Sequence, residues 1–116
     1  MADEKRRTPR IQPFVAPCRY VLGEQRLPGF LTDISRAGGR IHTEATAPAV
    51  GALVTVEARL GRRALPLRLR ATVRWVGSAP RGGSVFGVSF EGIGPDEQAV
   101  LDGVVGEFER RAASIE

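Results

Sequence analysis

The sequence predicts a mainly β domain: a small barrel or sandwich of about six short antiparallel strands, followed by one C-terminal helix. Three observations support this prediction. Apolar and polar residues alternate over most of the chain, which is the two-residue period of half-buried strands. Glycine-containing turns separate the alternating runs. Beyond residue 94 the apolar residues recur instead with the period of a helix.

The strongest strand signal spans residues 65–75, where apolar residues occupy the odd positions and basic or polar residues most of the even ones. The segment 54–60 alternates in the same way, and residues 61–63 between the two runs predict a hairpin turn. Residues 86–90 predict a further strand after the glycine-rich turn at 80–83.

Three earlier segments, residues 14–21, 27–35 and 40–43, give weaker strand signals. Prolines within or beside them indicate strands that lie at sheet edges or start late, because proline cannot donate a backbone hydrogen bond to a neighbouring strand. These prolines are Pro13, Pro17 and Pro28.

The last quarter of the chain predicts a helix over about residues 95–112. Pro95 suits the first turn, and Asp96 and Glu97 complement the positive end of the helix dipole. The apolar residues on one face of this helix are Val100, Leu101, Val104, Val105 and Phe108. We therefore expect a single domain over residues 13–116, preceded by a flexible Arg-rich arm over residues 1–12.

The composition, with 42% hydrophobic and 26% charged residues among 116, is that of a globular domain. No apolar run approaches the length of a membrane span, and the charged N-terminus lacks the apolar stretch of a secretory signal. The single cysteine, Cys18, cannot form an internal disulfide and is expected to be a small, partly buried apolar residue. These features predict a cytoplasmic location.

Charge is distributed unevenly along the chain. The net charge is +4, but residues 91–116 carry seven acidic residues and only two arginines, so residues 1–90 have a net charge of +9. Such a body favours anionic partners, which could be nucleotides, nucleic acid or an acidic protein.

Two short motifs stand out. In the first, Arg6, Arg7 and Arg10 offer guanidinium groups that match phosphate oxygens and the O6 and N7 acceptors of guanine. The alternative for this segment is a solvated basic N-terminus. Pro9 disfavours a helix here, so we expect a loop or an extended turn.

The second motif comprises Asp33, Ser35, Gly38 and Gly39. In a strand, Asp33 and Ser35 leave the same face while Ile34 points to the core. The carboxylate could accept hydrogen bonds from the N1–H and N2–H₂ of guanine beside the serine hydroxyl. The glycines allow positive φ and close backbone approach. The alternative is an ordinary Asx or Ser turn that ends the strand.

No serine triad, P-loop or paired-carboxylate motif is evident, so the sequence does not predict an enzyme. His42 is the only histidine, which makes a metal site improbable.

The order of the motifs resembles the PilZ domain family over essentially the whole chain. An Arg-x-x-x-Arg arm precedes Asp-x-Ser-x-x-Gly, a Val-x-Trp-Val strand and a Phe-Gly-Val-x-Phe strand. The matching residues are Arg6, Arg7, Arg10, Asp33, Ser35, Gly38, 73–76 and 86–90. The resemblance implies a six-stranded antiparallel β-barrel with a C-terminal α-helix that binds cyclic di-GMP.

The resemblance also implies roles. Arg6 and Arg10 would clasp phosphate and guanine, Asp33 and Ser35 would read the guanine on the barrel surface, and Arg7 and Gly38 would support them. Ala37 stands where many members carry glycine. The ligand would bind as one molecule or as a stacked dimer, without a cofactor.

Gly39, Arg74 and Trp75 are secondary candidates for ligand contact. By its place in the alternation Trp75 groups with Leu69 and Val73, which predicts a core location for the indole. Arg74 lies on the opposite face of that strand and is expected to extend the positive surface or to be solvated.

The sequence thus predicts a cyclic di-GMP receptor that signals to an effector protein, with motility or exopolysaccharide production as the regulated process by resemblance to the family. One alternative is an interaction adaptor that keeps the fold and binds no nucleotide. Another is a small basic nucleic-acid-binding barrel, which the absence of interleaved exposed aromatics disfavours.

Overall fold

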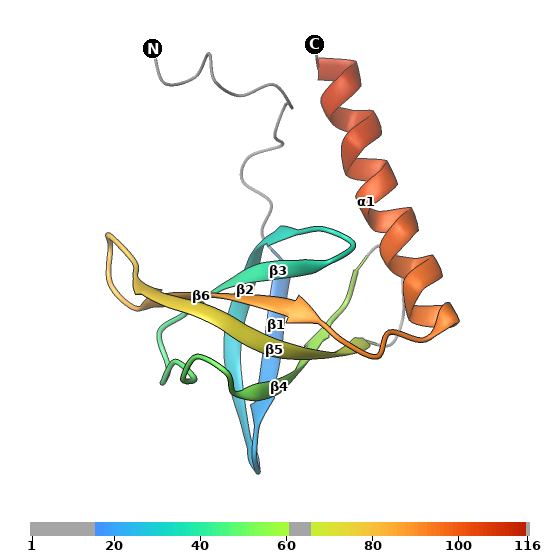
Figure 1. Cartoon of the computed structure of the whole chain (residues 1–116). Coiled ribbons are helices and arrows are strands. Elements are labelled where there is room, and N and C mark those ends of the chain that lie inside the picture. The colour runs from blue at the N-terminus through green and yellow to red at the C-terminus, as the bar shows by residue number, and fades with distance from the viewer. Residues whose placement is uncertain (1–15, 61–65, 116) are drawn as a thin grey trace.

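In the computed structural model, which describes residues 16–60 and 66–115, six strands and one helix follow one another along the chain (Figure 1). They are β1 (Ala16–Leu22), β2 (Gln25–Ile34), β3 (Gly38–Thr43), β4 (Leu53–Ala58), β5 (Leu67–Ser78), β6 (Ser84–Phe90) and α1 (Pro95–Ile115). All neighbouring strands are antiparallel, and the order β1-β2-β3-β6-β5-β4 closes into a barrel. The predicted six strands and helix are confirmed. Of the two predicted architectures, a barrel or a sandwich, the structure has the barrel.

Two predicted features lie outside the described residues: the arm over residues 1–12 and the turn at residues 61–63. The strands on either side of that turn, β4 and β5, pair antiparallel as the alternation predicts, with Ala58 opposite Leu67.

The barrel interior collects the apolar side chains of the alternating strands. Tyr20 and Phe86 are fully buried and meet edge to face, with ring centroids 5.1 Å apart. The Tyr20 hydroxyl donates a hydrogen bond to the carbonyl of Thr46 at 2.7 Å, so this polar atom is satisfied inside the core. Cys18, predicted to be partly buried, is buried in the core, and the loss of hydration raises the pKa of its thiol to about 11.

Two strands carry an irregularity that changes which way their side chains point. The register of β2 against β3 shifts between Leu31 and Asp33, and that of β5 against β6 shifts between Val73 and Trp75. A bulge inserts one unpaired residue, so the inward and outward positions exchange beyond it. The predicted core location of Trp75 is therefore wrong: its side chain is 45% exposed on the outer surface.

The bulge in β2 has the matching effect. Leu31 and Ile34 are three residues apart, yet both pack in the core, while Asp33 is half-exposed outside. The prediction that Ile34 points inward and Asp33 outward is confirmed. Both bulges place polar or aromatic side chains on one part of the outer wall.

A closed barrel has no free edge, but Pro17 and Pro28 occupy positions where their strands lack a neighbour on one side, and Pro13 lies outside the described residues. Pro28 precedes Phe30, the residue at which β2 begins to pair with β3. Pro17 likewise precedes Cys18, where the pairing of β1 with β4 begins. Each proline therefore lies where one side of its strand has no ladder to complete.

Helix α1 extends slightly past the predicted end and closes against the barrel through its first half. Leu101, Val104 and Val105 are buried, and Val100 packs against the core. The second half stands clear of the strands in Figure 1. Asp102 accepts a hydrogen bond from the Arg36 guanidinium at 2.9 Å, which links α1 to the loop between β2 and β3. In the described part of the chain, no helix is apolar enough over a sufficient length to cross a membrane.

Candidate ligand-binding site

The outer wall of the barrel has an open hollow of about 360 Å³ where β2, β3, β5 and β6 adjoin. Five residues that were singled out from the sequence line it together: Asp33, Ser35, Gly38, Gly39 and Trp75. Arg74 stands next to this hollow rather than in it. The other lining residues are Ala37, Arg40, Val88 and Ser89. The arm arginines Arg6, Arg7 and Arg10 lie outside the described residues.

Ser35 builds the turn at the end of β2. Its Oγ accepts hydrogen bonds from the backbone N–H groups of Ala37 and Gly38, both at 3.2 Å. Its own N–H donates to the Gly38 carbonyl at 2.8 Å. The turn interpretation that the sequence left open is therefore correct for Ser35. The hydroxyl fixes the loop that carries the hollow's rim.

Gly38 is required by a close approach of two backbones. A Cβ at this position would lie 2.0 Å from the Val88 carbonyl oxygen, because Gly38 pairs with Ser89 across β3 and β6. The space at Gly39 is less restricted, because a Cβ there would lie 3.0 Å from the Asp33 carbonyl oxygen. Neither glycine has positive φ, so that part of the prediction is wrong and the close approach alone is confirmed.

Ala37 fits its position without difficulty. The residue is exposed, its N–H donates to Ser35 Oγ, and its carbonyl accepts from the Phe90 N–H at 2.8 Å. Both backbone groups are thus engaged while the methyl group faces outward, so alanine here leaves the turn intact.

The Asp33 carboxylate is paired across the strands with Arg40, a residue that the sequence analysis missed. Arg40 lies opposite Asp33 in the β2–β3 register, and its Nη2 is 3.4 Å from Asp33 Oδ2. Both side chains are partly exposed and so remain accessible to a ligand. The hairpin register would have revealed Arg40, but the bulge before Asp33 shifts that register by one residue.

Trp75 borders the hollow because of a glycine on the neighbouring strand. Trp75 is paired with Gly87 in the β5–β6 register, and a Cβ on Gly87 would lie 2.1 Å from the indole Nε1. The indole therefore rests against the backbone of β6 while nearly half of its surface stays accessible. An aromatic ring held in this way can stack on a planar base.

Arg74 is held at the rim of the hollow by two neighbours. Its Nε donates to Ser89 Oγ at 2.7 Å, and its guanidinium lies 3.6 Å from Glu91 Oε2. Ser89 lines the hollow, whereas Arg74 itself does not. Arg74 is thus adjacent to the site. Glu91 offsets the positive charge of Arg74, so Arg74 extends the positive surface less than the sequence predicts.

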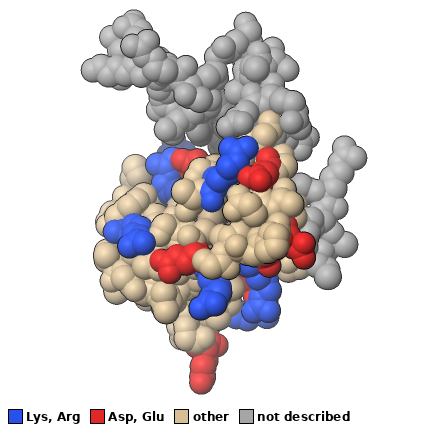
Figure 2. Space-filling view, turned by 45° about the vertical axis from the view of Figure 1, so that its right-hand side comes forward, with Lys and Arg blue, Asp and Glu red and all other residues tan. Residues whose placement is uncertain are grey.

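The hollow combines a carboxylate, a guanidinium, hydroxyls and an exposed indole, which suits a ligand with polar edges, a planar ring and anionic groups. On the face in Figure 2, basic and acidic side chains alternate rather than forming a surface of one sign. Within residues 16–60 and 66–115, no group of three or more His, Cys, Asp or Glu side chains could hold a metal ion.

A family model described as the PilZ domain matches residues 4–107. PilZ proteins are binding or adaptor domains rather than enzymes. No curated protein matches the chain.

Solved structures with the same fold include the PilZ domain with c-di-GMP of YcgR from Escherichia coli. Sequence identity is 17%, the TM-score is 0.69 and the match covers 95% of each chain. The Bacillus subtilis Inhibitor of motility (MotI/DgrA) matches at 18% identity and a TM-score of 0.67 over 89% of this chain and 51% of its own.

MrkH of K. pneumonia matches at 15% identity and a TM-score of 0.70 over 97% of this chain and 53% of its own. The chain therefore spans about half the length of MotI and of MrkH. At these identities the likeness concerns the fold. Because the family model covers most of its residues and the barrel has the same architecture, the chain belongs to the PilZ domain family.

Proposed function

We propose that this protein is a cyclic di-GMP receptor whose ligand binds between the N-terminal arginine arm and the hollow on the barrel wall. The observation that carries the proposal is the convergence of Asp33, Gly38 and Trp75 on one hollow of a PilZ barrel. The family match begins at residue 4 and therefore includes the arm. A solved PilZ domain of the same fold has c-di-GMP bound.

Each group has a chemical role in this proposal. Asp33 accepts hydrogen bonds from the N1–H and N2–H₂ of a guanine, a pattern that a carboxylate matches with two oxygens. Arg6 and Arg10 bind phosphate oxygens and the O6/N7 edge, with Arg7 beside them. Ser35 and Gly38 shape the loop, and Trp75 stacks on a guanine ring.

Arg40 adds a role that follows from its ion pair. It holds the Asp33 carboxylate in place at 3.4 Å and contributes positive charge next to a site for an anionic ligand. Gly39 keeps the backbone of β3 close to Asp33. No cofactor takes part, and the bound species is one cyclic di-GMP or a stacked dimer.

Ligand binding then alters the surface that a partner protein recognises. Arg36, which follows Ser35 in the loop, is paired with Asp102 of α1, so a change in the loop reaches the helix. Motility is the favoured process, because one protein of similar fold is an inhibitor of motility.

Isothermal titration of the purified protein with cyclic di-GMP tests the proposal and gives the stoichiometry. We expect saturable binding that Arg10→Ala or Asp33→Asn weakens by about tenfold to a hundredfold, since each substitution removes charged hydrogen bonds worth about 1.5–3 kcal/mol. Glu24→Gln is a matched control for Asp33→Asn, because Glu24 is exposed in the β1–β2 turn. The absence of binding, or unchanged affinity in both site variants, would refute the proposal.

A further inference from the structure

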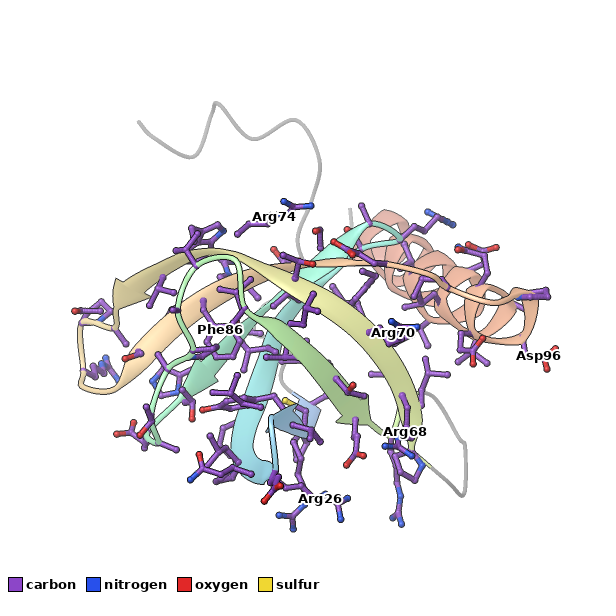
Figure 3. The ribbon with its side chains drawn as sticks, turned by 60° about the horizontal axis from the view of Figure 1, so that its bottom comes forward. Arg26, Arg68, Arg70, Arg74, Phe86 and Asp96 are labelled. Carbon is purple, nitrogen blue, oxygen red and sulfur yellow. The ribbon has the colours of Figure 1, made fainter. Side chains whose placement is uncertain are left out.

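A second and larger hollow, of about 610 Å³, lies on the outer wall formed by β1, β2 and β4. It shares no lining residue with the hollow at Asp33. Figure 3 shows Arg68 near the start of β5, with Arg26 close to it, and Arg74 further along the same strand. Arg68 and Arg74 are six positions apart on β5, which corresponds to about 20 Å. Arg68 pairs with Glu57, which lines the second hollow, and Arg74 donates to Ser89, which lines the hollow at Asp33. The two surfaces are therefore separate.

This second face carries a row of charged side chains across three strands. Arg19 lies opposite Glu57 in the β1–β4 register, and Glu57 lies opposite Arg68 in the β4–β5 register. Glu57 is only 7% exposed and is engaged by Arg26 at 2.6 Å and by Arg68 at 3.1 Å. One carboxylate thus anchors two guanidinium groups, which satisfies it in its nearly buried position.

Two further arginines on this face have no ion-pair partner within the described ranges, 16–60 and 66–115. Arg19 and Arg59 are both exposed and line the hollow. With Arg26 and Arg68 they give four guanidinium groups around a single carboxylate. The face therefore retains an excess of positive charge after its internal pairing.

An apolar row runs beside the charged row. Phe30 lies opposite Pro17 in the β1–β2 register, and Pro28 lies opposite Arg19. Phe30 is 46% exposed, so its ring is accessible to a partner. Pro66 completes the apolar lining. A rigid apolar floor beside arginines is the pattern of a protein-recognition surface, in which aromatics and arginine are enriched.

We propose that this face, defined by Arg19, Arg26, Phe30, Glu57, Arg59 and Arg68, docks an acidic segment of a partner protein. Carboxylates of the segment pair with Arg19 and Arg59, and an apolar side chain next to them packs on Phe30 and Pro17. Among the described residues, Phe30 is the only aromatic side chain that lines this hollow, so a row of rings for base stacking is missing, which disfavours a nucleic-acid strand. The proposal is independent of cyclic di-GMP, because the two surfaces share no residues.

Fluorescence anisotropy tests this surface with a defined probe. The probe is a short fluorescein-labelled peptide of alternating glutamate and leucine, compared with a polyglutamate peptide, a lysine–leucine peptide and a single-stranded DNA oligonucleotide. We expect saturable binding of the glutamate–leucine peptide that weakens as salt is added, weaker binding of polyglutamate, and none of the lysine–leucine peptide.

The variants assign the binding to this face. Arg19→Ala and Arg59→Ala should each lower the affinity for the peptide by about threefold to tenfold, and Phe30→Ser by about tenfold. None of the three substitutions should change the affinity for cyclic di-GMP. Arg81→Ala and Val50→Ser are the matched controls, since both residues are exposed elsewhere on the barrel and are expected to leave binding unchanged. Neither control residue lines the second hollow.

Three results would overturn the proposal. One is no binding of the glutamate–leucine peptide while circular dichroism shows a folded protein. A second is an equal loss in Arg81→Ala and Arg19→Ala, which would indicate nonspecific attraction by net charge. The third is tighter binding of the oligonucleotide than of the peptide, abolished by Arg19→Ala and Arg59→Ala, which would identify a nucleic-acid surface instead.

Discussion

The indole of Trp75 lies against Gly87 of the adjacent strand, so closely that a methyl group on Gly87 would meet Nε1 at 2.1 Å. This contact fixes the aromatic border of the candidate site. It depends on a bulge that turns Trp75 outward and on a glycine that makes room for the ring.

Gly87→Ala should displace the indole and destabilise the barrel. Overpacking of this kind costs about 1–3 kcal/mol. Chemical denaturation measures the loss, and the emission of Trp75, the only tryptophan, reports the movement of the ring. Gly77→Ala, in the neighbouring strand β5 that carries Trp75, is the control, since nothing lies within 4 Å of its Cβ position. Equal stability of the two variants would contradict the contact.

Gly38→Ala should be more harmful, because the obstructing atom is a backbone oxygen that cannot rotate away. The Cβ would lie 2.0 Å from the Val88 carbonyl oxygen, so β3 and β6 must separate locally. We expect a loss of about 3 kcal/mol or more in the free energy of unfolding, comparable with the largest single-residue effects. Ala37→Gly, in the loop directly before Gly38, should change stability by no more than about 1 kcal/mol. A tolerated Gly38→Ala would show that the two strands are not held this close.

Trp75→Leu should separate binding from stability. The side chain is half-exposed, so we expect a stability change of about 1 kcal/mol or less. Loss of base stacking should lower the affinity for cyclic di-GMP by about fivefold to a hundredfold, in line with about 1–3 kcal/mol per stacked base. Titration calorimetry measures the affinity, and in the wild type the emission of Trp75 should change on ligand addition. Val50→Ala serves as a control for the loss of an exposed apolar side chain.

The Cys18 thiol should make stability depend on alkaline pH. Burial raises its pKa from 9.0 to about 11, so between these values the unfolded chain has released the proton that the folded chain retains. The unfolded state then binds fewer protons, and stability falls as pH rises through this window, by up to about 2 kcal/mol.

Urea denaturation at several pH values between 8 and 11 measures this effect, as the difference between the wild type and Cys18→Ala, because other groups titrate equally in both. The same burial predicts slow reaction of the native thiol with Ellman's reagent and fast reaction after unfolding. Parallel pH profiles of the two proteins would contradict the assignment.

The strand pattern could be predicted because alternation is a local property of the chain. Residues 67–73 of β5 and 86–90 of β6 show this alternation directly, and the stripe that begins at Val100 shows the longer period of a helix, which is equally local. Asp33, Ser35 and Gly38 could be singled out because their residue types match a guanine edge and a tight turn. The family resemblance, rather than the periodicity, joined them to the arginine arm.

Other features depend on register, which no local pattern reveals. The extra residue in β5 reversed the predicted orientation of Trp75, and the one in β2 hid the partner of Asp33, Arg40. The row of Arg19, Glu57 and Arg68 arises from three separate strands that the sequence keeps far apart.

By itself, the sequence determined the mainly β class, the helix after Gly94 and the polar motif that ends β2. These follow from the periodicity of apolar residues and from the chemistry of neighbouring side chains. Only the tertiary structure decided that the sheet closes, that Trp75 faces outward and that Arg40 meets Asp33. A one-residue bulge moves every later side chain to the other face, and cross-strand partners are chosen by hydrogen-bond register between distant segments.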